Sequence, residues 1–98
     1  MEIIYKTRKI QRICEDASVA TRTHGERMAL IIHQRVDELS AAPTVEMLVQ
    51  YRIGGCHPLT GNRAGQYGMS LVHPYRLVFE KVTENAVEVR ILEIVDYH

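Results

Sequence analysis

The hydrophobic pattern of this chain changes its period near Gln50, and this change constrains the fold more than any other feature. Before it, apolar residues recur at helical spacing; after it, they alternate with polar residues as in β-strands. Helices followed by strands are typical of α+β domains, in which helices pack on one face of an antiparallel sheet. We predict that residues 1–98 form one two-layer domain of this class, since the length suits a single core.

Two helices are expected before the change, behind a short strand that contains Ile3 and Tyr5. Thr7 can cap the first helix, whose apolar positions follow i, i+3, i+4, i+7 spacing: Ile10, Ile13, Cys14 and Ala17. Residues 23–26 have the spacing of a capping box and predict the start of the second helix. Its apolar side continues to Leu39, and Pro43 ends it. Thr44 starts a further turn.

After Gln50, short connections predict an antiparallel meander with strands at 50–53, 56–59, 66–72, 75–82 and 86–95. The last of these strands changes phase along its length. Val89 and Ile91 share one face, but Leu92 and Ile94 continue the apolar series one step out of phase. Two explanations stay open: a β-bulge near residues 91–92, or a strand buried on both faces near its end.

Composition narrows the classes of function. Twelve basic and twelve acidic residues give zero net charge, which argues against a partner held mainly through phosphate charges. The N-terminal segment lacks the apolar core of a secretory signal, and no run could span a bilayer. We therefore expect a cytoplasmic protein with no membrane partner, in which Cys14 and Cys56 are reduced thiols.

Polar side chains of three segments give the candidate site: HPLTGNR at 57–63, HPYR at 73–76 and DYH at 96–98. By alternation, Arg76 points away from Leu77 and Phe79. In a meander these segments can meet on one sheet surface. A cluster of His, Arg, Asp and Tyr suits phosphodiester cleavage, in which a base takes the 2′-hydroxyl proton, an acid protonates the leaving oxygen and arginine stabilises the phosphate.

Structural explanations compete with this interpretation. The two His-Pro pairs can be turn dipeptides, Tyr97 can be an edge aromatic, and Arg76 can pair with Glu80 or Glu93 in an exposed ion pair. A metal site is conceivable, but its members lack tight ligand spacings: His57, His73, Asp96 and His98. We therefore expect no metal or other cofactor.

The second half of the chain resembles the HigB branch of the RelE/ParE toxin superfamily. The matching segments are HPLTGNRAGQYGMSL, YRLVFE and the terminal EIVDYH, in this order and spacing. The resemblance implies a RelE-like fold and a toxin of a type II toxin–antitoxin pair, which enters the ribosome and cuts mRNA without a metal ion. It also implies a HigA-like helix-turn-helix antitoxin, through which the complex would bind operator DNA.

Residue by residue, the resemblance makes His57 and Asp96 the proton-transfer groups and Arg76 the phosphate-stabilising cation. It places Tyr97 and His98 at the nucleotide, with Arg63 as a phosphate contact. Relatives commonly read His-Pro-Leu-Lys-Gly-Asp-Arg where this chain has Thr60 and Asn62, and Trp where it has Tyr75. His73 is a candidate replacement polar group beside the substrate.

Two functional classes remain open. One is a ribosome-dependent mRNA endonuclease, favoured by the His-Arg-Asp-Tyr-His set. The other is a non-catalytic member of the superfamily: a ParE-like gyrase inhibitor, or a decayed toxin that only binds its antitoxin. Thr60 in place of the lysine and the neutral charge favour this second class.

Overall fold

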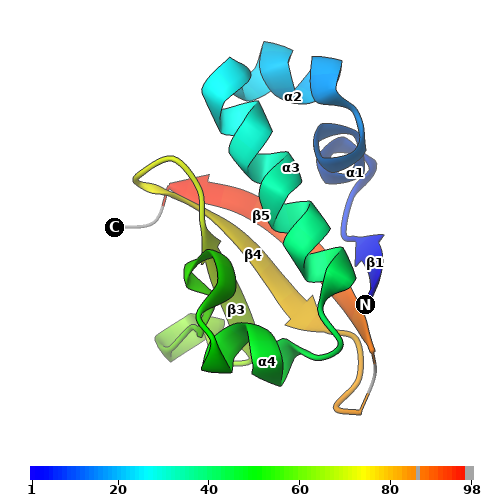
Figure 1. Cartoon of the computed structure of the whole chain (residues 1–98), viewed down its shortest axis with the longest axis vertical. Coiled ribbons are helices and arrows are strands. Elements are labelled where there is room, and N and C mark those ends of the chain that lie inside the picture. Colours follow the sequence, from blue (N-terminus) through cyan, green and yellow to red (C-terminus); the bar gives the residue numbers. More distant parts are fainter. Residues whose placement is uncertain (86, 97–98) are drawn as a thin grey trace.

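The computed structural model describes residues 1–85 and 87–96 and has helices on one side of a five-stranded sheet (Figure 1). The elements are β1 (Glu2–Tyr5), α1 (Arg8–Glu15), α2 (Ala17–His24), α3 (Glu26–Ala41), α4 (Val45–Gln50), the 3₁₀ turn η1 (Ile53–Gly55), β2 (His57–Pro58), the 3₁₀ turn η2 (Gly61–Arg63), β3 (Gln66–Ser70), β4 (Tyr75–Lys81) and β5 (Glu88–Asp96). No helix in the described ranges is long and apolar enough to cross a membrane. The α+β class expected from the sequence is confirmed.

The sheet has the order β1-β5-β4-β3-β2. Strands β2 to β5 pair antiparallel in succession, which confirms the predicted meander. The sheet is nevertheless mixed, because β1 runs parallel to β5, with Tyr5 opposite Ile91. A parallel pair needs a long crossover, and here the entire chain between β1 and β5 forms that connection. The first strand therefore joins the sheet at an edge that the meander alone does not specify.

Two of the predicted helix caps are confirmed. The Thr7 hydroxyl accepts a hydrogen bond from the Ile10 amide, and the Thr44 hydroxyl accepts one from the Met47 amide, both at 3.2 Å. Each threonine is extended and is followed directly by helix, α1 and α4 respectively. These hydroxyls satisfy amides that have no partner in the first turn of a helix.

The predicted capping box at 23–26 is wrong. Thr23 lies inside α2, where its hydroxyl donates to the Val19 carbonyl at 2.8 Å. Helix α3 instead follows Gly25, whose φ of +87° suits glycine. Gly25 has no side chain that could cap the helix. The chain between Thr7 and Gly25 also contains two helices, because Asp16 is extended and caps α2 through the Ser18 amide at 2.9 Å.

The strand predicted at 50–53 is also wrong. Gln50 ends α4, and Arg52 adopts the left-handed conformation with φ of +50°. The chain then enters η1, where Gly54 and Gly55 have φ of +61° and +69°. Successive left-handed residues reverse the chain and cannot continue a strand. The other predicted strands are present as β2 to β5 with shorter bounds, while Ala86 lies outside the described residues.

The change of phase in the last strand is a β-bulge. Phe79 pairs with Ile91, but Val78 pairs with Glu93, which leaves Leu92 as an extra residue on β5. Of the two explanations left open by the sequence, the structure shows the β-bulge near residues 91–92. After it, Ile94 lies opposite Leu77 on the helix face, and Glu93 lies on the other face.

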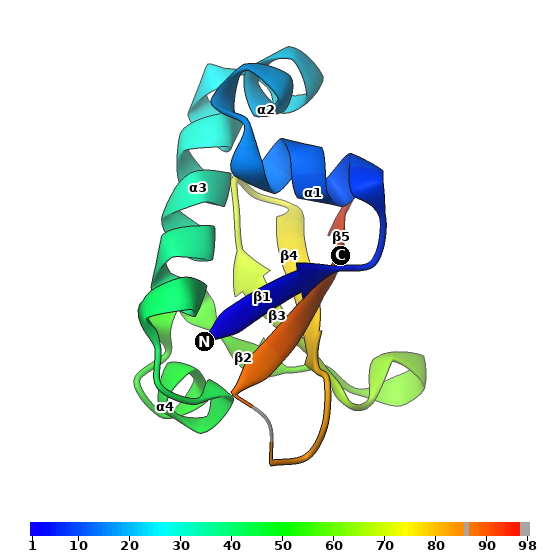
Figure 2. The same ribbon diagram turned by 90° about the vertical axis from the view of Figure 1, so that its right-hand side faces the viewer.

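The main core lies between the helices and one face of the sheet. Phe79 is at its centre and stacks on Tyr67 with ring centroids 5.4 Å apart. Fully buried residues of both layers surround this pair: Ile32, Leu39 and Leu48 from the helices, and Met69, Leu77, Val89 and Ile91 from the strands. Figure 2 shows α3 along this side of the sheet and η2 projecting on the other. The face away from the helices is thus not covered by a helix.

Both thiols should resist alkylation while the protein is folded. Burial raises the pKa of Cys14 to about 12, with the Glu15 carboxylate adding to the effect, and burial raises the pKa of Cys56 to about 11. The reactive thiolate is therefore scarce in neutral or mildly alkaline buffer. We expect mass spectrometry to find no iodoacetamide adduct on native protein and two on denatured protein. Rapid labelling of Cys14 under native conditions would contradict this packing.

Candidate functional site

The sheet face away from the helices carries one transverse row of residues that joins four strands. The register aligns His57, Gly68, Val78 and Glu93 on β2, β3, β4 and β5. The next row toward the β5 terminus contains Ser70, Arg76 and Val95. Standard strand spacings put the Cα atoms of His57 and Arg76 roughly 12 Å apart, so their side chains can flank a group bound between them.

His57 is held by the backbone that precedes it. Its Nδ1 lies 3.0 Å from the Gly55 carbonyl, and because a carbonyl only accepts, Nδ1 carries the proton. Nε2 is then an acceptor. The ring lies over β3, where a Cβ on Gly68 would come within 3.7 Å of His57 Cε1 and 3.3 Å of Leu59 Cδ2. Gly68 therefore leaves room for His57 and Leu59 above the sheet.

Two of the three arginines described on this face are paired with carboxylates. Arg63 Nη1 donates to Glu93 Oε2 at 3.3 Å and to Gln66 Oε1 at 3.0 Å. Arg90 Nη1 donates to Glu80 Oε2 at 2.8 Å. The two glutamates considered as partners of Arg76 are thus engaged by other arginines. This removes the interpretation of Arg76 as half of an exposed ion pair.

Arg76 is the arginine of this face without a carboxylate partner among the described residues. Its Nη1 makes a long contact of 3.4 Å to the Tyr75 carbonyl, and its buried Nε has no hydrogen-bond partner within residues 1–85 and 87–96. A buried donor without a partner costs about 1–3 kcal/mol. Such an unpaired donor on an otherwise well-packed strand makes Arg76 a candidate ligand-binding group.

The remaining predicted residues lie elsewhere. Asp96 pairs with Tyr75, so alternation places it on the helix face, opposite to Arg76. Thr60 is exposed at the start of η2, and His73 is exposed in the turn before β4. Tyr97 and His98 lie outside the described residues. The structure therefore brings together His57, Arg63 and Arg76, and does not bring Asp96 onto their face.

Glu93 and Gln66 join the site without having been predicted as site residues. Both accept hydrogen bonds from Arg63 in η2: Glu93 does so from β5, and Gln66 does so from the start of β3. Glu93 reaches this face only because the bulge at Leu92 changes the phase of β5. The signal was present in the apolar pattern, but its effect on the charged neighbour becomes visible only with the register.

The described residues include no group of three or more His, Cys, Asp or Glu side chains that could hold a metal ion. A cleft of about 360 Å³ lies on the other side of Glu93, between α1, the end of α2 and β5. Lys9 and His24 are among its lining residues, and burial, followed by the charge of Lys9, lowers the pKa of His24. Arg76 and His57 are not among its lining residues, so this cleft meets the candidate site only at Glu93.

No protein-family model and no curated protein sequence matches the chain. Two solved structures are similar over its whole length. A YoeB/ParE toxin from Agrobacterium tumefaciens is 14% identical, with a TM-score of 0.66 and all of both chains covered. A YoeB-YefM complex from Staphylococcus aureus contains a chain that is 19% identical, with a TM-score of 0.63 and 97% of that chain covered. The chain therefore shares the fold of these toxins, which agrees with the RelE-like fold that the resemblance implied, while the HigB branch stays a prediction.

Replacing Arg76 should not destabilise the protein. Arg76→Met keeps much of the aliphatic stem and removes the unpaired donor, so the free energy of unfolding should stay unchanged or rise by up to about 1 kcal/mol. The matched control is Arg90→Met on β5, which breaks the ion pair with Glu80 and should lower it by less than about 1 kcal/mol. Urea denaturation measures the free energy of unfolding of both variants and of the wild type. A loss of about 2 kcal/mol or more in Arg76→Met would show that Arg76 is structural.

Proposed function

We propose that this protein is the toxin of a type II toxin–antitoxin system and that it cuts mRNA in the ribosome. The fold shared with YoeB/ParE toxins supports the general class. The observation that carries the enzymatic assignment is Arg76: a guanidinium without a carboxylate partner among the described residues, on the same sheet face as His57. A group suited to proton transfer, His57, and a group suited to charge stabilisation, Arg76, then lie on the same surface.

The proposed reaction is attack of an RNA 2′-hydroxyl on the adjacent phosphate, without a metal ion. His57 Nε2 accepts the 2′-hydroxyl proton while Nδ1 stays bonded to the Gly55 carbonyl. Arg76 stabilises the negative charge that develops on the phosphate oxygens. The bond from phosphorus to the 5′-oxygen breaks, which leaves a cyclic 2′,3′-phosphate and a 5′-hydroxyl after protonation. Arg63 supplies a further phosphate contact.

The last two residues keep their proposed roles from the HigB resemblance. Tyr97 and His98 would position the nucleotide, the first by stacking on a base. The resemblance also gives Asp96 a proton-transfer role, but its side chain lies on the face opposite to Arg76, so in the proposed reaction solvent water protonates the leaving oxygen. Because Asp96 pairs with Tyr75 rather than Arg76, we assign removal of the 2′-hydroxyl proton to His57 alone.

The proposed partners are an antitoxin, the ribosome and mRNA in the cytoplasm. One similar structure is titled as a complex of YoeB with YefM, which supports a protein partner that restrains the toxin. From the HigB resemblance we propose a HigA-like helix-turn-helix antitoxin, which would also bring the complex to operator DNA.

Inducible expression with mapping of mRNA 5′ ends tests the function directly. We expect cuts within translated codons that disappear when translation is blocked. Intact mRNA together with halted DNA replication would instead support the gyrase-inhibitor alternative. Intact mRNA with normal replication, and binding of a co-encoded antitoxin, would support a decayed toxin.

Arg76→Ala should suppress cleavage without unfolding the protein. Loss of a charge-stabilising donor slows reactions on the order of a hundredfold or more. The matched control is Arg90→Ala, which removes an arginine from the same face but one already paired with Glu80. Single-turnover cleavage of mRNA on programmed ribosomes measures both. Equal rates for the two variants would remove Arg76 from the site.

Thr60→Lys should strengthen cleavage or ribosome association severalfold at low salt. Thr60 is exposed beside η2, so a lysine there adds a cation near the proposed phosphate path. Thr60→Gln lengthens the side chain without charge and should leave both properties unchanged. The gain of the lysine variant should shrink across a salt series. A gain of equal size in both variants would argue against a phosphate contact.

A further inference from the structure

His57 owes its orientation to a turn that a distant helix supports. The Gly55 carbonyl accepts the Nδ1–H of His57, so the position of η1 decides where the ring lies. That turn is short and contains Arg52, Gly54 and Gly55 with positive φ values. Its backbone closes through Gly55 N to Arg52 O at 2.9 Å and Cys56 N to Ile53 O at 3.0 Å. The two glycines adopt these values without a steric penalty, whereas Arg52, just before η1, is a non-glycine residue in the left-handed region and stores some strain there.

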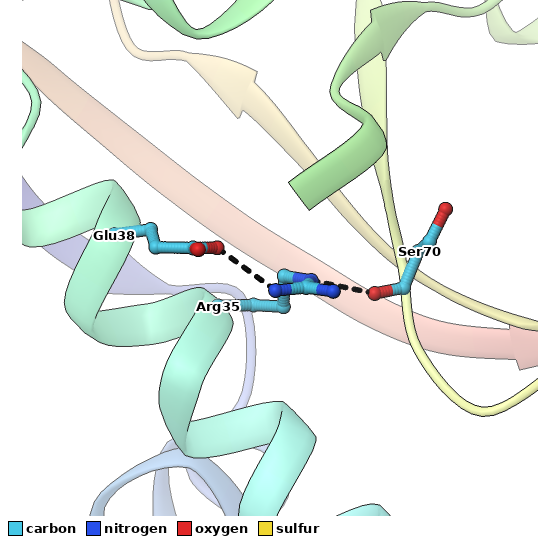
Figure 3. Close-up of polar contacts among 3 residues, drawn as sticks. All are labelled: Arg35, Glu38 and Ser70. Atoms are coloured by element: carbon cyan, nitrogen blue, oxygen red, sulfur yellow. Dashed lines mark hydrogen bonds and ion pairs between the residues drawn. The ribbon is translucent and has the colours of Figure 1, made fainter. Parts of the chain in front are cut away.

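Arg35 on α3 makes two polar contacts, with Glu38 and with Ser70 (Figure 3). Its Nε donates to the Ser70 carbonyl at 2.7 Å, and its Nη1 donates to Glu38 Oε1 at 3.0 Å. The side chain of Arg35 is 16% exposed. Glu38 fixes the planar guanidinium from one side while Ser70 fixes it from the other, so its rotamer is well determined.

The turn packs directly against this fixed arginine. A Cβ on Gly54 would lie 2.7 Å from Arg35 Cδ, 2.9 Å from Arg35 Nε and 2.9 Å from Glu38 Oε1. A Cβ on Gly55 would lie 2.6 Å from Ser70 Oγ. Gly54 thus lies against Arg35 and Glu38, and Gly55 lies against Ser70. Ser70 is in turn the register partner of Arg76 on β4.

We propose that Arg35 is a positioning residue, whose guanidinium, clamped by Glu38, fixes the Gly54–Gly55 turn and thereby the Nδ1–H tautomer and orientation of His57. The inference rests on the proposed function, in which His57 transfers a proton. Arg35 itself does not touch the substrate. It acts through contacts that link α3 to β3 and both to the start of β2.

The primary test is Arg35→Gln in the full-length chain, observed in two independent ways. Imidazole ¹⁵N chemical shifts report which nitrogen of His57 carries the proton. We expect the wild type to have Nδ1 protonated and the variant to show a mixture of tautomers. Misplacing a reacting group by about 1 Å can cost on the order of a hundredfold, so kcat for ribosome-programmed mRNA should fall by roughly tenfold to a hundredfold. KM should change less than about twofold.

Two further variants separate positioning from general damage. Arg27→Gln changes an exposed arginine on the same helix and should leave the His57 signals and kcat unchanged. Glu38→Gln keeps the bond from Arg35 to Ser70 and weakens the clamp, so it should shift the His57 tautomer in the same direction by a smaller amount. This variant serves as the test if Arg35→Gln fails to fold.

The outcomes are distinct. Unchanged His57 signals in Arg35→Gln, or in Glu38→Gln if the first variant unfolds, would overturn the proposal even if cleavage fell. Changed His57 signals with slower cleavage would support it. Changed signals in a protein whose wild type does not cut mRNA would support the positioning of His57 by Arg35 and refute the proposed function.

Discussion

The burial of β4 on both faces is the constraint on which the rest of the structure depends. Leu77 and Phe79 pack into the helix layer, whereas Val78 between them is equally buried on the other face, outside the main core. A strand whose side chains are buried on both faces must lie inside the sheet, because a strand at the edge of a sheet leaves part of its surface open to solvent. Its neighbours β3 and β5 are thereby fixed, and Arg76, one residue before Leu77, is placed on the face without helices.

Local signals predicted the parts of the fold that local chemistry decides. Thr7 and Thr44 cap their helices because the hydroxyl of an extended residue just before a helix meets free amides. The out-of-phase apolar pair near the end of the chain gave the bulge as one of two explanations. The capping box at Thr23 failed because a hydroxyl inside a helix bonds the preceding turn equally well. The parallel partner of β1 is a contact between distant segments, which neither periodicity nor turn chemistry specifies.

The candidate site, like the fold, could be predicted from the sequence only where local patterns decide it. Alternation placed Arg76 correctly because it lies on a regular strand, and the register sets His57 on the same face. Asp96 follows the bulge, and one extra residue moves every later side chain of β5 to the other face. The predicted bulge thus already contained the information that separates Asp96 from Arg76. The pair of Arg63 and Glu93 depends on the path of η2 and could be seen only in three dimensions.

The pairing of Arg63 with Glu93 has a consequence for selectivity. In the free protein this guanidinium already holds a carboxylate, so any incoming phosphate must compete with an anion built into the sheet. Bulk nucleic acid offers only transient phosphate contacts and therefore competes poorly with Glu93 for Arg63. The chain has no net positive charge that would attract nucleic acid in addition. An RNA strand that other contacts hold in place can displace Glu93 from Arg63, because its phosphate stays at high local concentration. Under the proposed function, Glu93 would therefore act as a threshold that favours pre-positioned RNA over RNA met by chance.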